Sequence, residues 1–116
     1  MKLTKQILRD KYKIYNPYMI CVGTKTNVYI DYTPANSRLI DLSAEWVVYR
    51  LDEHLINRSP VYGRNEKNDK LQKTLSWASQ KFGISEWEKS PFGSYHPKGT
   101  LEKLIKTEKG NATQNT

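Results

Sequence analysis

Two short runs rich in aromatic and β-branched residues, 18–22 and 28–32, lie close together near the start of the chain. The segment between them, 23–27, has the length of a hairpin loop and contains Gly23. Such runs joined by a short glycine-containing loop predict a β-hairpin, with Val28, Ile30 and Tyr32 on one face. A third short strand over 38–42 is also expected, although Pro34 and Asn36 set it apart from the hairpin.

Helical periodicity surrounds this predicted hairpin. Helices are expected over 3–13, ended by Asn16 and Pro17; over 44–57, as the central core helix; over 68–82, with Gly83 as its C-terminal stop; and after Thr100, carrying Leu101, Leu104 and Ile105. The connecting segments 58–67 and 83–99 are expected to be loops because both hold proline and glycine and neither is periodic.

Together these elements predict an α+β fold: a single domain over 1–109 that holds an N-terminal helix, a β-hairpin with a third strand, and then helices. The alternative is a mostly α protein with a small β-ribbon. A chain of 116 residues is long enough to fold as one domain without disulfides. Residues 110–116 are polar and aperiodic, and they are expected to form a flexible tail.

Cys21 is the only cysteine, so the chain cannot form an internal disulfide or a thiolate metal cluster. Charges throughout the first residues do not suit a signal peptide, and no apolar run has the length of a membrane span. These features predict a cytoplasmic protein that does not act at a membrane. No metal-ligand spacing and no glycine-rich phosphate loop is present, so no cofactor and no metal are expected.

The net charge of +7 favours a polyanionic partner, and the excess is concentrated at 1–15 and 61–83. Two sets of residues share the spacing i, i+3, i+7, i+11, which gives a stripe along a helix. They are Lys2, Lys5, Arg9 and Lys13 in the first set and Lys70, Lys73, Trp77 and Lys81 in the second. Ammonium groups replace counterions along phosphates, and an indole can stack on an unpaired base.

The leading hypothesis is therefore a non-enzymatic protein that binds nucleic acid, either RNA or DNA. The residues predicted to make the contacts are Lys5, Arg9, Lys70, Lys73, Trp77 and Lys81. An alternative interpretation of equal weight is that the lysines form a solvent-exposed helix face, with Trp77 packed under the 87–95 segment.

Two other function classes stay open. Eight tyrosines and three tryptophans suit a protein-protein adaptor or inhibitor, or a homodimer, because these residue types anchor interfaces. A small metal-independent ribonuclease is the third class. Its candidate catalytic residues are His96 and Tyr95, in a predicted loop, and His54.

Overall fold

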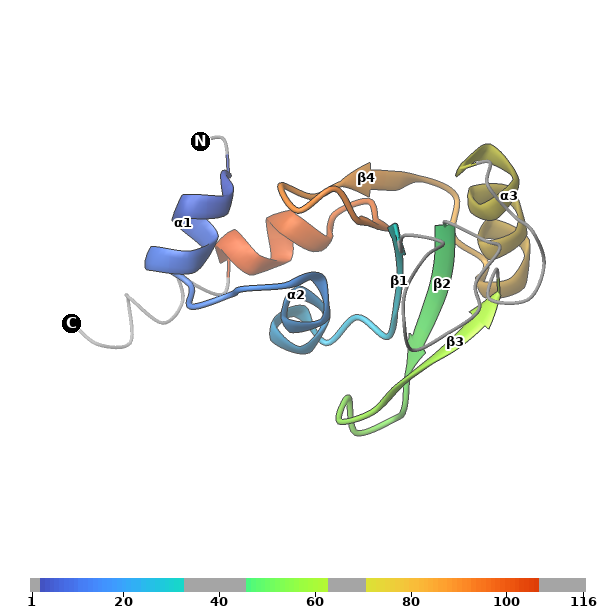
Figure 1. Ribbon diagram of the computed structural model, residues 1–116, viewed down its shortest axis with the longest axis horizontal. Coiled ribbons are helices and arrows are strands. Elements are labelled where there is room, and N and C mark those ends of the chain that lie inside the picture. The colour runs from blue at the N-terminus through green and yellow to red at the C-terminus, as the bar shows by residue number, and fades with distance from the viewer. Residues whose placement is uncertain (1–2, 33–45, 63–70, 107–116) are drawn as a thin grey trace, which may run out of the picture.

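The computed structural model describes residues 3–32, 46–62 and 71–106 and has an α+β fold (Figure 1). Its centre is a five-stranded antiparallel sheet with the strand order β3-β2-β1-β5-β4. The strands are β1 (Val28–Tyr32), β2 (Trp46–Leu51), β3 (Arg58–Tyr62), β4 (Trp87–Lys89) and β5 (Tyr95–Pro97). The helices are α1 (Lys5–Asp10), α2 (Pro17–Thr24), α3 (Leu71–Phe82) and a last helical segment over 100–106.

The sheet is covered on both faces, α3 lying on one side and α2 on the other (Figure 1). Val28 and Ile30 of β1 pack with Val48 of β2 and Ala78 of α3. Tyr29, between them, points to the opposite face and packs with Cys21 of α2 and Leu51 of β2. Because successive side chains of a strand point to opposite faces, β1 contributes residues to the apolar clusters on both sides of the sheet.

A third apolar cluster lies beyond the sheet and joins helices from the two ends of the described chain. Leu8 of α1, Ile20 of α2 and Leu104 of the 100–106 segment are buried together, with Ile14 beside them. The C-terminal helical segment is thereby held against α1 (Figure 1). The predicted helices at both ends of the chain are confirmed, although α1 ends at Asp10 and Lys13 has a φ of 57°. Lys13 therefore does not continue the α1 stripe.

The strand predicted over 18–22 is wrong, because these residues form α2. Asn16 caps this helix: its Oδ1 accepts a hydrogen bond of 2.9 Å from the backbone N–H of Met19. Pro17 follows at the first helical position, where its fixed φ suits a helix and its missing N–H costs nothing. The cap and the proline decide the local structure over the strand preference of the residues that follow.

The helix predicted over 44–57 is also wrong, since the described part of it holds β2 and a tight turn. Asp52 organises the turn, as its Oδ1 accepts hydrogen bonds from the N–H groups of His54 (3.1 Å) and Ile56 (3.0 Å). Leu55 takes a φ of 60° within it. The chain then returns as β3, in a segment predicted to be a loop.

Residues 83–99 form a second hairpin in place of the predicted loop. Strands β4 and β5 pair through Glu88 and His96, and Ser90 N donates to the carbonyl of Ser94 at their turn (2.7 Å). Gly83 ends α3 as predicted, with a φ of 68° and an Ile84 N–H that donates to the Ser79 carbonyl (3.1 Å). The strand predicted over 38–42 and the tail over 110–116 lie outside the described residues.

No helix in the described ranges combines the length and the apolar character needed to cross a bilayer.

Candidate nucleic-acid interface

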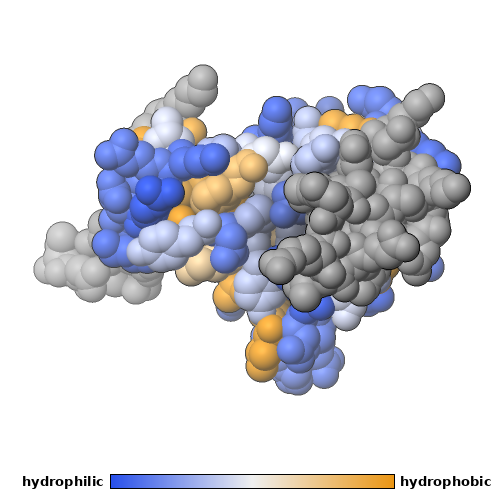
Figure 2. Space-filling view, viewed as in Figure 1, coloured by the Kyte–Doolittle hydropathy of each residue, from blue (hydrophilic) through white to orange (hydrophobic). Residues whose placement is uncertain are grey.

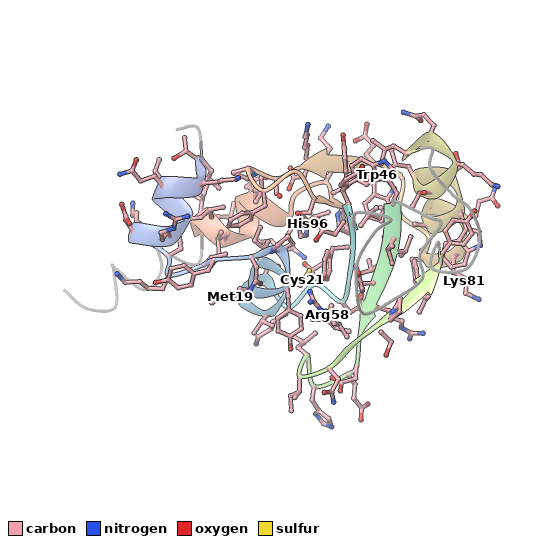
Figure 3. The ribbon with its side chains drawn as sticks, viewed as in Figure 1. Met19, Cys21, Trp46, Arg58, Lys81 and His96 are labelled. Carbon is pink, nitrogen blue, oxygen red and sulfur yellow. The ribbon has the colours of Figure 1, made fainter. Side chains whose placement is uncertain are left out.

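The two predicted basic stripes lie on helices at opposite ends of the molecule (Figure 1). Lys5 and Arg9 are exposed on α1, in a region of largely hydrophilic surface (Figure 2). Lys73 and Lys81 are exposed on α3, and Lys81 is labelled near one end of this helix (Figure 3). Lys70 lies outside the described residues. The structure therefore does not join the two stripes into one surface.

Trp77 packs within the core on the α3 side of the sheet. Its ring stacks on Tyr62, with ring centroids 4.3 Å apart and planes at 16°. It also forms a T-shaped pair with Phe82, with ring centroids 6.1 Å apart. Tyr62 thus covers one face of the indole, and Trp77 is packed against the cluster around Val28 and Ala78. This packing agrees with a structural role for Trp77 more closely than with a ring presented to a ligand.

A different group of basic residues converges on one cavity, which we call the basic cavity. It has a volume of about 340 Å³ and lies between the end of α3, the start of β1 and the end of β5. Its lining residues are Lys25, Thr26, Asn27, Val28, Phe82, Ile84, Pro97, Lys98, Thr100 and Lys103. The three lysines come from three separate segments, and no described carboxylate is among the lining residues.

Local backbone structure positions each of these lysines. Lys25 is the C-cap of α2 in the left-handed conformation (φ 58°), and its N–H donates to the carbonyls of Cys21 and Val22. Lys98 follows β5, with its N–H donating to the Glu86 carbonyl at 3.0 Å. Lys103 lies in the first turn of the 100–106 segment, where its N–H donates to the Gly99 carbonyl.

An acidic neighbour neutralises the charge of Lys98 only weakly. Lys98 Nζ lies 3.2 Å from Glu86 Oε2, but both side chains are about two-thirds exposed, so solvent screens this pair. A second cavity of about 300 Å³ on the β2–β3 side offers a contrast, because Asp52 and Glu53 join Arg50 in its lining. Lysine ammonium groups are charged at neutral pH, so the basic cavity suits an anion and the second cavity does not.

The sequence patterns did not select Lys25, Lys98 or Lys103 as contact residues. These lysines belong to three different local structures, the end of α2, the end of β5 and the 100–106 segment, so no periodic pattern connects them. The left-handed Lys25 gave no signal either, because glycine or asparagine is the usual residue there.

The candidate catalytic residues are not brought together. His96 is fully buried on β5, whereas His54 lies in the turn between β2 and β3 with its side chain 73% exposed, next to Glu53 (3.3 Å). Tyr95 is adjacent to His96 on the same strand and therefore points to the opposite face of the sheet, where it contacts Trp46. A substrate could not reach His96 without opening the core.

His96 belongs instead to a buried polar chain on the α2 side of the sheet. Its Nδ1 lies 3.7 Å from Cys21 Sγ, and its Nε2 is hydrogen-bonded to Ser94 Oγ (2.7 Å), which is bonded in turn to Ser90 Oγ (2.6 Å). Figure 3 shows His96 and Cys21 near one another in the middle of the molecule. Burial lowers the pKa of His96 to about 4 and raises that of Cys21 to about 12, so both are neutral at pH 7.

An aromatic and arginine cluster continues this buried layer toward β3. Tyr29 stacks on His96 (5.7 Å between centroids) and on Tyr49 (5.2 Å), and Arg58 donates a hydrogen bond to its hydroxyl. The Arg58 guanidinium also lies over the rings of Tyr18 and Tyr49. Burial raises the pKa of Tyr29 and outweighs the opposing effect of Arg58. This cluster ties α2, β1, β2 and β3 together, which is a structural role.

The tyrosines outside this cluster differ widely in exposure. Tyr15 is 55% exposed and Tyr32 is 47% exposed, whereas Tyr62 is buried. No group of three or more histidine, cysteine, aspartate or glutamate side chains lies together in the described part of the chain.

A search of protein-family models, of curated proteins and of solved structures found no match to this chain.

Proposed function

We propose that this protein is a small, non-enzymatic nucleic-acid-binding protein of the cytoplasm, and that its main phosphate contact is the basic cavity. The observation that carries this proposal is the convergence of Lys25, Lys98 and Lys103 on one cavity whose described lining has no carboxylate. Lysine ammonium groups bind phosphate oxygens and release condensed counterions, which favours binding to a chain of phosphates.

The position of the basic cavity supports contacts with both predicted basic patches. Phe82 forms part of its wall, and the exposed Lys81 is the preceding residue on α3. Lys103 belongs to the helical segment that packs on α1 through Leu104 and Leu8. We propose that a strand bound at the cavity extends past Lys81 on α3 and along the 100–106 segment toward α1.

The proposal needs no reactive side chain. The buried neutral histidine and thiol have no access to a ligand, and the exposed His54 is separate from them. The cytoplasm is proposed because a chain with a single cysteine makes no use of internal disulfides, as is usual for proteins of a reducing compartment.

Fluorescence anisotropy of labelled single-stranded RNA and DNA at several salt concentrations tests the proposal. The expected result is micromolar or tighter binding at low salt, with a dissociation constant that rises steeply as salt is added. Anisotropy that stays flat at low salt for both RNA and DNA would contradict it.

A further inference from the structure

We infer that the basic cavity binds one nucleotide unit, with the phosphate among the three lysines and the base against the apolar wall made by Phe82, Ile84 and Pro97. This inference rests on the proposed function and names the ligand more closely. Two features of the cavity support it, its size and the distribution of chemical groups around it.

The size of the cavity matches one nucleotide rather than a bare phosphate. Ligand cavities in proteins begin at about 300 Å³, and this one has a volume of about 340 Å³. A phosphate ion would occupy only a small part of that space. The remainder is bounded by side chains that a planar base can pack against.

The lining holds both basic and apolar residues. Val28, Phe82 and Ile84 belong to the core cluster on the α3 side of the sheet, so the apolar wall is an extension of a packed core. The three lysines are exposed. Lys25 follows α2, Lys98 follows β5, and Lys103 lies in the first turn of the 100–106 segment. A ligand with a charged end and a flat apolar end fits this arrangement, and a nucleotide has both.

Asn27 adds a group that can hydrogen-bond to the edge of a base. Its backbone is held in place because its carbonyl accepts a hydrogen bond from Leu51 N (2.8 Å), while the residue itself is exposed in the cavity lining. An amide side chain both donates and accepts, which is the combination that a base edge requires.

The nucleotide site favours single strands over duplexes. In a duplex the bases are stacked and paired, so none can lie against Phe82 without being flipped out. Single strands should therefore bind more tightly than duplexes of the same length. A ligand at Phe82 should also change tryptophan emission, because the Phe82 and Trp77 rings form a T-shaped pair.

The test is a titration of AMP, adenosine and inorganic phosphate into the full-length protein, followed by the NMR amide signals of the cavity residues. AMP should bind at least about tenfold more tightly than phosphate or adenosine alone, because it uses both regions. Phe82→Leu should weaken AMP binding severalfold and leave phosphate binding unchanged. Phe92→Leu is the matched control, since Phe92 packs in the cluster around Leu8, away from the cavity.

The possible results separate the inference from the proposed function. AMP binding that single-stranded oligonucleotides compete away supports both. AMP binding to a protein that ignores oligonucleotides supports the nucleotide cavity, with free nucleotides as its source, and contradicts the proposed function. If oligonucleotides bind while AMP is no better than phosphate, or if Phe82→Leu and Phe92→Leu behave alike, the inference is overturned and the proposed function stands.

Discussion

Cys21 Sγ lies 3.7 Å from Nδ1 of His96, although 75 residues separate the two in sequence. The contact joins α2 to β5 in the layer where both side chains are fully buried. A cysteine next to a histidine can form a nucleophile pair, but such a pair needs a thiolate and access to substrate. Burial opposes both requirements, so the contact stabilises the fold.

The buried His96 should make stability depend on pH in the acid range. Its pKa is lowered from the usual 6.5 to about 4, so the unfolded chain takes up a proton at a higher pH than the folded one. The resulting stability is fully present above pH 6.5 and is lost as the pH falls from 6.5 to 4, by about 3 kcal/mol in total.

Urea unfolding at pH 7, 5.5 and 4.5 measures this dependence. His96→Gln keeps hydrogen-bonding groups but cannot take up a proton in this range, so its free energy of unfolding should change less between these pH values than that of the wild type. Equal pH dependence in the two proteins would show that His96 is not the group responsible.

The Cys21 thiol should be unreactive in the folded protein. Burial raises its pKa to about 12, which removes the thiolate at neutral pH and also blocks the approach of a reagent. Modification of the native protein by a colorimetric disulfide reagent should be at least about a hundredfold slower than modification of the protein unfolded in urea. The reagent reaches the thiol only when the native protein transiently unfolds. Rapid stoichiometric labelling of the native protein would be inconsistent with the buried position.

Trp77→Ala should destabilise the fold. The substitution removes a ring that stacks on Tyr62 and contacts Phe82, and loss of a packed tryptophan typically costs about 3 kcal/mol. Lys73→Ala, on the same helix but exposed, should change stability by less than about 0.5 kcal/mol. A Trp77→Ala protein as stable as the Lys73→Ala protein would mean that the indole is not part of the core.

Lys25 should contribute to binding without contributing to stability. Its left-handed conformation (φ 58°) is unfavourable for lysine and well tolerated by asparagine, so Lys25→Asn should leave the free energy of unfolding unchanged or raise it by up to about 1 kcal/mol. The same change should weaken oligonucleotide binding severalfold.

Lys13→Asn is the matched control for Lys25→Asn. Lys13 is also exposed and left-handed (φ 57°), and it is not among the residues that line the basic cavity. The two variants should have similar stability. Lys13→Asn should bind oligonucleotides more tightly than Lys25→Asn does. Equal losses of affinity would indicate a response to overall charge alone.

The α+β class could be predicted from the sequence because local signals agreed with it at several elements. Val28–Tyr32 is a strand, and Leu71–Phe82 is a helix ended by Gly83. The strand prediction after Asn16 is wrong because Asn16 and Pro17, which follow the first helix, also begin the next one. In β2, Val47 and Leu51 fit a helical stripe as well as the alternation with Tyr49, and pairing with β1 decided the outcome.

The candidate site was harder to predict than the fold. Helical spacing selects residues on one helix, whereas Lys25, Lys98 and Lys103 meet only because β1, β5 and the last helical segment come together in space. The same tertiary packing moves Trp77 away from the exposed lysines and onto Tyr62. Neither event leaves a pattern in a single sequence.

The most direct test of the account compares two triple variants by oligonucleotide anisotropy across a salt series. One variant, Lys25→Asn with Lys98→Gln and Lys103→Gln, removes the lysines of the basic cavity; the other, Lys13→Asn with Lys89→Gln and Lys106→Gln, removes three exposed lysines outside its lining. Both lose the same net charge. We expect the cavity variant to lose at least about tenfold in affinity. Its slope of log affinity against log salt should become shallower by about 0.7 per lost phosphate contact on a single strand, while the control variant stays close to the wild type. Matching affinities and salt slopes in the two variants would contradict it.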